Sequence, residues 1–310
     1  MGRLVDGIWH VSSVITSDSM CSYDRLPRTF LETISSSHSL YRPEANRYHL
    51  YVSYACPWAT RTLIYRQLKG LADYISVDVV HPDMGDDGWI FDDTFEGSSR
   101  DSLHGFKFLR QVYLEADPLA STSVTVPILW DKKTGSIVNN ESSQIIRIFN
   151  SAFNDLTGNT DDFYPSSLRR EIDDLNEKIY QTVNNGVYKT GFATNQESYD
   201  EAVTSLFDTL DELDQRLTNS KYLLGDEITE ADLRLIPTLL RFDVVYFTHF
   251  KCNWKRIVDY KNLHRYMLDL YSVPAIKDTC HLDHIKRHYY FSHRGINPQR
   301  IIPKGPQKIF

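Results

Sequence analysis

The feature that most constrains the fold is a strand–helix–strand pattern in residues 47–80. Arg47–Ser53 is rich in aromatic residues and alternates in polarity, which is typical of a β-strand. Residues 60–68 have helical character and lead to Gly70, and Tyr74–Val80 reads as a second strand. Two strands joined by a helix within about thirty residues make a βαβ unit, in which the strands are parallel and the crossover is right-handed. The chain is therefore expected to contain an α/β domain.

The α/β pattern continues after an interruption. Residues 81–107 are acidic and rich in glycine, and a loop of this length inside a domain is usually functional or mobile. A helix over 108–116, two short strands over 124–130 and 136–138, and a helix over 141–149 follow. The predicted order is β-α-β-α-β-β-α.

Beyond Asn150 the sequence is helical, without convincing strands. The predicted helices cover residues 168–182, 199–218, 229–247, 255–271 and 276–288. Thr229 and Asp232 have the spacing of a capping box at the start of the third. We therefore predict an arm over 1–45, an α/β domain over 46–150, an all-α domain over 151–288 and a polar C-terminal extension over 289–310.

Composition narrows the classes of partner. Hydrophobic residues make up 41% of the chain, enough for real cores, and the net charge is −7, which argues against nucleic acid or an anionic membrane as the main partner. No apolar run approaches the roughly 20 residues that a membrane helix needs, and the N-terminus has no signal-peptide core. The cysteines are too widely spaced for a disulfide framework and fit a reducing, cytoplasmic location: Cys21, Cys56, Cys252 and Cys280.

Cys56 is the candidate nucleophile. Pro57 falls in the first turn of the expected helix, which places Cys56 at the N-cap, facing unpaired backbone N–H groups and the positive end of the helix dipole. Such a position favours the thiolate, the nucleophilic form of cysteine. The alternative is that Cys56 is a small apolar residue at a helix start, as most lone cysteines are.

The fourth residue of the Cys-Pro-Trp-Ala motif indicates which thiol completes the reaction. A dithiol oxidoreductase has a second cysteine where this chain has Ala59. A mixed disulfide on Cys56 must therefore be resolved by an external thiol. Glutathione is the abundant one in the cytosol.

Two further motifs suggest a peptide-like ligand. A cis peptide at Val126-Pro127 would leave the Val126 backbone free to bind an extended peptide, although an ordinary strand-edge proline is the alternative. Glu141 and Ser142 open a helix, where they can hold the ammonium and carboxylate of a γ-glutamyl group or simply cap the helix.

Other patterns in the sequence are weaker evidence for a binding site. Cys280, His281, His284 and His288 recur at helical spacing, but no paired cysteine motif accompanies them, and we expect no metal site. The acidic residues of the long loop lack the ordered alternation of a calcium loop. No phosphate-binding or dinucleotide-binding fingerprint is present.

Together these motifs resemble the glutathione transferase superfamily over roughly residues 45–290, with a cysteine-type active site similar to the omega group. CPWATRTLI, GWIF at 88–91, NNGVYKTGFAT at 184–194 and HIKRHYY with the following SHRGINP are similar to the xi class, the glutathionyl-hydroquinone reductases. The resemblance implies an N-terminal thioredoxin-like domain followed by an all-helical C-terminal domain. It also implies a homodimer.

The resemblance also implies roles for particular residues. Glutathione, as co-substrate, would contact the following set: Trp89, Arg110, Val126, Pro127, Glu141 and Ser142. Tyr188 and Tyr289 would join Cys56 as catalytic residues over the electrophile, with the neighbouring Tyr290 as an alternative to Tyr289. The implied reaction is reduction of S-glutathionyl-hydroquinones through a Cys56–glutathione mixed disulfide.

Two other functions remain open at this point. An omega-like transferase would use the same Cys56 chemistry as a thioltransferase and dehydroascorbate reductase. A non-catalytic module with the transferase fold would serve protein association, although the intact Cys56, Val126-Pro127 and Glu141-Ser142 motifs argue against it.

Overall fold

The computed structural model describes residues 2–11 and 29–307 of the 310-residue chain. By packing, the described residues divide into two units: residues 2–11, 29–161 and 281–292 in the first, and residues 162–280 and 293–307 in the second. The helix over 282–292 thus packs with the first unit. The domain limits inferred from the sequence stay a prediction, and Cys21 lies outside the described residues.

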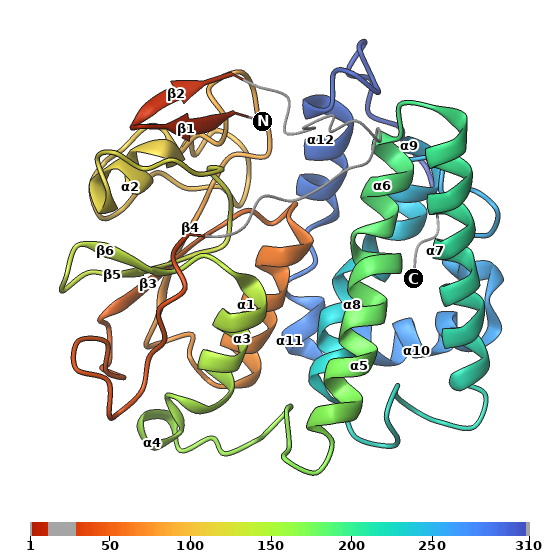
Figure 1. Cartoon of the computed structure of the whole chain (residues 1–310), viewed down its shortest axis with the longest axis horizontal. Coiled ribbons are helices and arrows are strands. Elements are labelled where there is room, and N and C mark those ends of the chain that lie inside the picture. Colours follow the sequence, from red (N-terminus) through yellow and green to blue (C-terminus); the bar gives the residue numbers. More distant parts are fainter. Residues whose placement is uncertain (1, 12–28, 308–310) are drawn as a thin grey trace. The chain divides into compact units, whose positions relative to one another are not determined.

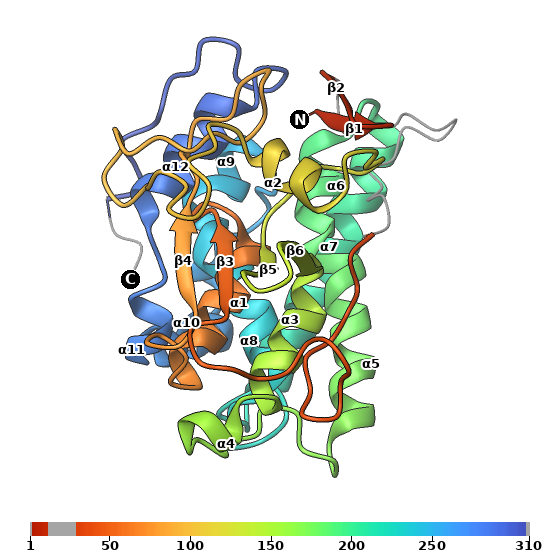
Figure 2. The same cartoon turned by 90° about the vertical axis from the view of Figure 1, so that its left-hand side faces the viewer.

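A four-stranded mixed sheet forms the centre of the first unit (Figure 2). Its order is β4-β3-β5-β6, with bounds Ser76–Val79, Tyr48–Val52, Ile128–Asp131 and Ser136–Asn139. β3 and β4 are parallel, as predicted, while β5 runs antiparallel to both β3 and β6. All five residues of β3 are buried, so this strand is the core of the sheet.

Helices α1 (Pro57–Leu68) and α3 (Ser142–Ser151) pack side by side against one face of the sheet (Figures 1 and 2). Pro57 is the first residue of α1, where its missing N–H removes no helical hydrogen bond. Gly70, just after the helix, has φ of 64°, a conformation that glycine adopts without strain. The unit also contains α2 (Leu109–Ala116) and α4 (Asn154–Thr157).

The prediction that residues 1–45 form only an arm is wrong for residues 3–10. β1 (Arg3–Val5) and β2 (Ile8–His10) form an antiparallel hairpin. The turn residues Asp6 and Gly7 have φ of 49° and 76°, which is the pattern of a two-residue type I′ turn. Leu4 is fully buried and exchanges two backbone hydrogen bonds with Thr122, of 2.9 and 3.0 Å.

The long loop over 81–107 contains no helix or strand, as predicted, yet buried carboxylates organise it. Asp78 accepts hydrogen bonds from the N–H (2.7 Å) and hydroxyl (2.8 Å) of Ser102. Asp101 accepts from the Tyr51 hydroxyl and the Phe106 N–H, each at 3.0 Å. Burial alone would raise the pKa of Asp78, but the hydrogen bonds that it accepts hold the pKa below its ordinary value.

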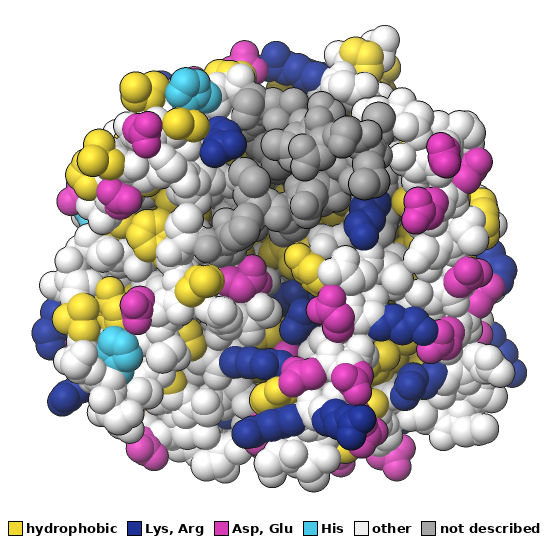
Figure 3. Space-filling view, in the orientation of Figure 1, with side chains coloured by type: hydrophobic (Ala, Val, Ile, Leu, Met, Phe, Trp, Pro, Cys, Tyr) yellow, Lys and Arg dark blue, Asp and Glu magenta, His cyan; other side chains and the backbone are white. Residues whose placement is uncertain are grey.

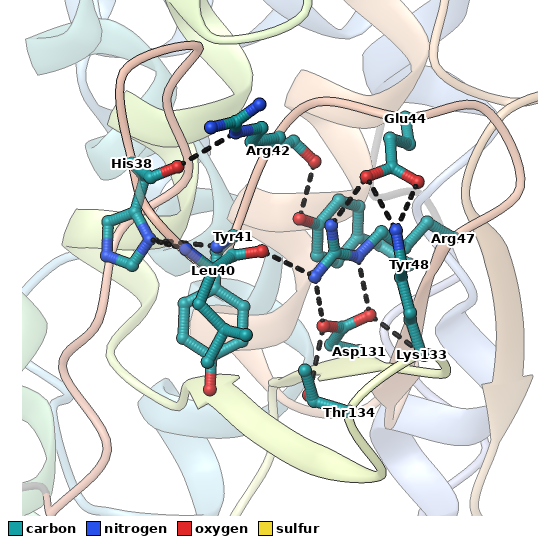
Figure 4. Close-up of polar contacts among 10 residues, drawn as sticks. All are labelled: His38, Leu40, Tyr41, Arg42, Glu44, Arg47, Tyr48, Asp131, Lys133 and Thr134. Carbon is teal, nitrogen blue, oxygen red and sulfur yellow. Dashed lines mark hydrogen bonds and ion pairs between the residues drawn. The ribbon is translucent and has the colours of Figure 1, made fainter.

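A buried ion pair between Arg47 and Asp131 fixes the segment that leads into β3 (Figure 4). The Arg47 guanidinium donates two hydrogen bonds to Asp131, of 2.8 and 2.6 Å, and further bonds to Glu44 and to the Leu40 carbonyl. Thr134 donates to the same Asp131 carboxylate at 2.9 Å. The cluster therefore ties the segment before β3 to the β5–β6 turn.

The described part of the second unit consists of helices joined by loops and contains no β-strand element. Its elements are α5 (Arg169–Ile179), η1 (Tyr180–Asn184), α6 (Gly186–Phe192), α7 (Gln196–Arg216), α8 (Glu230–Arg241), η2 (Phe242–Tyr246), α9 (Phe247–His249), η3 (Ile257–Asp259), α10 (Lys261–Tyr271) and α11 (Pro274–Lys277). Acidic and basic side chains intermingle over α5 and α7 (Figure 3), where Lys178 pairs with Glu212.

Several of these elements differ from the predicted helices. η1 and η2 are π-helical turns that continue α5 and α8, and α6 was not predicted. The helix predicted over 276–288 is two helices, α11 and α12 (Leu282–Ser292). The Thr279 hydroxyl bonds the Ile276 carbonyl at 2.9 Å, a local bond of the kind that competes with helix continuation.

The predicted capping box at the start of α8 is confirmed. The Asp232 carboxylate accepts hydrogen bonds from the N–H (2.8 Å) and hydroxyl (2.9 Å) of Thr229, and from the Tyr266 hydroxyl (2.9 Å). Burial raises the pKa of Asp232 even though these bonds lower it.

Candidate active site

Cys56 is the N-cap residue of α1, as predicted, between the end of β3 and Pro57. Its backbone is extended (φ −80°, ψ 119°), and its carbonyl accepts both the N–H and the hydroxyl of Thr60 at 3.0 Å. The thiol is partly exposed and forms no disulfide, and its side chain makes no capping bond. The α1 N-terminus therefore carries a free thiol at the positive end of its dipole.

The Val126-Pro127 peptide is cis, so the cis alternative that the sequence left open is the one found. The Cys56 thiol lies 3.7 Å from the Val126 carbonyl oxygen, to which it donates. Within the described residues, the Val126 N–H and carbonyl make no backbone hydrogen bond. An extended ligand beside Cys56 would find these backbone groups available for pairing.

Glu141 and Ser142 open α3. The Glu141 carboxylate accepts from the N–H (2.9 Å) and hydroxyl (3.0 Å) of Ser143, so this residue caps the helix. Ser142 is almost fully buried. Asn139 Oδ1 in turn accepts the Glu141 N–H at 2.8 Å, which fixes the backbone at the start of α3.

Trp89, in the long loop, is buried and stacks on His288 of α12, with ring centroids 4.6 Å apart. Two hydrogen bonds join the same parts of the chain: His288 Nδ1 donates to the Pro82 carbonyl at 2.8 Å, and the Met84 N–H donates to Ser292 at 3.0 Å. The loop carrying Trp89 is thus fastened to α12.

Arg110 is engaged in protein contacts. Its guanidinium donates to the carbonyl (2.7 Å) and carboxylate (3.0 Å) of Asp87, and lies over the rings of Phe108 and Trp9 at 3.9 and 5.2 Å. The Trp9 indole N–H donates to the Asp86 carbonyl at 3.0 Å. Sequence reasoning missed Trp9, and the Asp-Gly turn of its hairpin is the signal that could have found it.

Tyr289 and its alternative Tyr290 are both buried residues of α12, in the same unit as Cys56. The Tyr289 ring meets His288 edge to face, with centroids 5.5 Å apart. Two residues before Tyr289, Arg287 forms a two-bond ion pair with Asp83, each bond 2.6 Å long. This pair also joins α12 to the loop that carries Trp89.

Tyr188 belongs to α6 of the second unit. Its ring is buried among Phe192, Tyr246 and Phe250, with centroid separations of 6.4, 6.0 and 5.5 Å. Helix α6 follows η1 after one residue, Asn185. The π-helical turn of η1 shifts the register of the side chains that come after it, including Tyr188.

Two of the histidines at helical spacing in α12 and just before it, His281 and His284, contact protein groups. His284 Nε2 meets the Glu96 carbonyl at 2.7 Å, and His281 stacks on Tyr54 with centroids 3.7 Å apart. Burial lowers the pKa of His284. Among residues 2–11 and 29–307, no group of three or more His, Cys, Asp or Glu side chains is placed to hold a metal ion.

No helix in the described part of the chain combines the length and apolar character needed to cross a bilayer.

Two family models match the chain. The model for the glutathione S-transferase N-terminal domain covers residues 55–152, and that for the C-terminal domain covers residues 196–268. The first range contains Cys56, Val126-Pro127 and Glu141. The matches agree with the predicted fold class, an α/β domain followed by an all-helical domain, and in the structure the sheet of the α/β domain has four strands and is mixed.

Individual relatives match nearly the whole chain. The glutathionyl-hydroquinone reductase YqjG of Escherichia coli is 51% identical, over 99% of this chain and 95% of its own length. The glutathione-bound structure of YqjG has a TM-score of 0.92 at 50% identity, covering 99% of this chain and 96% of that one. The glutathione S-transferase Xi of Phanerochaete chrysosporium has a TM-score of 0.93 at 51% identity, covering 95% and 96%. The chain belongs to the glutathione S-transferase family, in the group that contains the Xi-class transferases and the glutathionyl-hydroquinone reductases.

Proposed function

We propose that this protein reduces S-glutathionyl-hydroquinones with glutathione, using Cys56 as the nucleophile. The observation that carries the proposal is the free Cys56 thiol at the N-cap of α1, 3.7 Å from the Val126 carbonyl, with Ala59 in place of a second cysteine. The relatives named as glutathionyl-hydroquinone reductases support the choice of substrate.

The reaction has two steps. The Cys56 thiolate attacks the glutathionyl sulfur, the aryl carbon–sulfur bond breaks, and the carbon takes up a proton to give the hydroquinone. Cys56 and glutathione are then joined by a disulfide. A second glutathione, as its thiolate, attacks the glutathionyl sulfur, restoring the Cys56 thiolate and releasing glutathione disulfide. In the sum, two glutathionyl sulfurs are oxidised and the aryl carbon is reduced, with the proton of the second glutathione balancing the new C–H bond.

The glutathione moiety would lie along the first unit. We propose that the Val126 backbone pairs with the cysteinyl residue of glutathione beside Pro127. The start of α3, with Glu141 and Ser142, would receive the γ-glutamyl group, since a helix N-terminus favours a carboxylate. Trp89 and Arg110 complete the proposed set of glutathione contacts, and Arg110 also lies over the rings of Phe108 and Trp9.

The tyrosines would act on the hydroquinone. A phenol hydroxyl can hydrogen-bond a ring oxygen of the substrate and can supply the proton that the aryl carbon needs. We assign this role to Tyr289 and to Tyr188 from the family resemblance. No metal takes part in the proposed reaction, and glutathione is the only co-substrate.

The substrate assignment is tested by comparing rates with glutathionyl-menadione and with dehydroascorbate. We expect kcat/KM to be higher for glutathionyl-menadione than for dehydroascorbate. A preference for dehydroascorbate would instead identify an omega-like transferase. Absence of both activities, and of thioltransferase activity on a simple disulfide, would leave only a transferase-fold interaction module.

The nucleophile is tested by mass spectrometry after treatment with glutathione disulfide. We expect a glutathione adduct on Cys56 that reduced glutathione removes, and no turnover in Cys56→Ser, because an alcohol cannot form a mixed disulfide. Turnover retained by Cys56→Ser would show that another group is the nucleophile.

We further propose that the enzyme is a homodimer of the cytoplasm, where glutathione keeps thiols reduced. Light scattering of the purified full chain tests the first statement, and fractionation of the cells that produce it tests the second. A monomer at working concentration would contradict the dimer.

A further inference from the structure

The Tyr113 hydroxyl joins two segments that the proposed function assigns to glutathione. Tyr113 lies in α2 and is fully buried, with its ring edge-on to Phe30. Its hydroxyl donates to the Thr125 carbonyl at 2.9 Å and accepts the Thr125 N–H at 3.3 Å. It also accepts from the Asn140 side-chain amide at 3.3 Å. One donation and two acceptances use the full hydrogen-bonding capacity of a hydroxyl.

The two partners of this hydroxyl immediately precede the proposed ligand contacts. Thr125 comes before Val126, whose carbonyl accepts the Cys56 thiol. Asn140 comes before Glu141, the N-cap of α3. A single oxygen atom on a third element therefore sets the spacing between the backbone beside the nucleophile and the start of α3.

Within the described part of the chain, no other side-chain bond from Thr125 or Asn140 duplicates this link. Thr125 Oγ1 and Asn140 Oδ1 are both buried, and neither has a hydrogen-bond partner among the described residues. The Asn140 N–H is used elsewhere, on the Phe30 carbonyl at 3.0 Å. Replacing Tyr113 by phenylalanine would keep the ring in place and leave Thr125 and Asn140 without their shared partner.

We propose that Tyr113 is a positioning residue for glutathione: its hydroxyl holds the Val126 backbone and the α3 N-terminus at the separation that one glutathione molecule spans. The inference rests on the proposed function, because it takes these two segments as the glutathione site. Tyr113 itself does not touch the reacting atoms. Its loss should therefore weaken glutathione binding more than it slows chemistry at saturation.

The test is Tyr113→Phe in the full chain, with the Kd for reduced glutathione measured by titration calorimetry and KM and kcat measured in turnover. We expect Kd and KM for glutathione to rise about five- to tenfold, with kcat within about twofold of wild type. Tyr48→Phe is the matched control. Tyr48 is equally buried, and its hydroxyl donates at 2.7 Å to the carbonyl of Arg42, in the segment before β3, rather than to a residue next to Val126 or Glu141.

The control separates positioning from loss of stability. Both variants should lower the melting temperature, but Tyr48→Phe should leave the Kd for glutathione unchanged. An unchanged Kd in Tyr113→Phe, or an equal rise in Tyr48→Phe, would overturn the inference while leaving the proposed function intact.

A second variant covers the case in which Tyr113→Phe does not fold. Asn140→Ala removes only the α3 side of the bridge and should raise the Kd about threefold. An unchanged Kd in this variant would overturn the inference. Wild-type protein that fails to bind glutathione would overturn the proposed function, and the inference with it.

Discussion

The indole of Trp89 lies flat against the imidazole of His288, with ring centroids 4.6 Å apart and an angle of 22° between the planes. Because His288 Nδ1 donates to the Pro82 carbonyl, the imidazole is fixed in orientation as well as in place. The residue after it is Tyr289. The packing of the long loop against α12 therefore holds both Trp89, which we propose binds glutathione, and Tyr289, which we propose binds the hydroquinone.

The Asp83–Arg287 ion pair should control how firmly that loop is held. Both side chains are more than half-buried, and the two bonds of 2.6 Å give the pair a fixed geometry. We expect Asp83→Asn to increase amide hydrogen exchange in residues 82–91 and to raise KM for the glutathione conjugate several-fold. Mass-spectrometric hydrogen exchange and steady-state kinetics measure the two effects.

The same loop offers a matched control. Asp93 pairs with Arg100 at 3.0 Å, but the two side chains are 50% and 78% exposed. Solvent screening makes such a pair worth little, so Asp93→Asn should change neither exchange nor KM. If both variants behaved alike, the Asp83–Arg287 pair would have no special part in holding Trp89.

The cysteines should differ sharply in reactivity. Burial raises the pKa of Cys280 to about 11 despite the nearby Arg241, and burial also raises the pKa of Cys252. Both therefore remain neutral thiols at pH 7.5, and the Cys280 thiolate fraction grows only as the pH approaches 11. We expect iodoacetamide at pH 7.5 to label Cys56 at least about tenfold faster than either, measured peptide by peptide.

Turnover supplies the companion measurement. Cys280→Ser removes a partly exposed thiol that plays no part in the proposed reaction and should keep wild-type kcat/KM. Preferential labelling of Cys280, or loss of turnover in Cys280→Ser, would point to a different reactive thiol.

The parts of the fold that depend on local pattern could be predicted from the sequence. β3, α1 and β4 follow from alternation, a proline at the helix start and a glycine after its end, and these signals also place Cys56 at the N-cap. The capping box of Thr229 and Asp232 is local in the same sense.

What could not be predicted depends on partners far along the chain. The β1–β2 hairpin is short, and its place depends on the backbone bonds between Leu4 and Thr122. The Trp89–His288 stack and the Tyr113 bridge likewise join residues that no sequence window brings together. Long-range contacts of this kind carry no periodic signal, so they could not be predicted, whereas the place of Cys56 at the helix N-cap follows from local pattern.

The Arg47–Asp131 pair should contribute strongly to stability and give it a defined pH dependence. Burial by itself would raise the pKa of Asp131, but hydrogen bonds from Arg47, Lys133 and Thr134 lower it below the ordinary value. A lowered folded-state pKa stabilises the fold above the unfolded pKa of about 3.9, and this stabilisation is lost as pH falls through the folded pKa. Asp131→Asn should cost about 3 kcal/mol at pH 7, because it removes the buried carboxylate that accepts two hydrogen bonds from Arg47 and leaves the partly exposed Glu44 as the carboxylate that pairs with this buried guanidinium.

Chemical denaturation across pH 3–7 measures this effect. The difference between wild type and Asp131→Asn should be largest near pH 7 and shrink below about pH 4. Asp93→Asn is the control, since its ion pair with Arg100 lies on the surface, with the two side chains 50% and 78% exposed. A gap between wild type and Asp131→Asn that does not change with pH would mean that the carboxylate charge is not what stabilises this cluster.

The roles of Tyr289 and Tyr290 can be distinguished by comparing how substitution of each affects the reduction of two different substrates. Both are buried in α12, so phenylalanine at either position removes one hydroxyl and keeps the packing. If the Tyr289 hydroxyl contacts the hydroquinone, Tyr289→Phe should slow reduction of glutathionyl-menadione by about tenfold or more and leave reduction of a plain glutathione mixed disulfide within about twofold. Tyr290→Phe should affect the two substrates equally, because a purely structural loss does not distinguish them. The reverse pattern would assign the electrophile contact to Tyr290, and equal effects in both variants would remove the α12 hydroxyls from the chemistry.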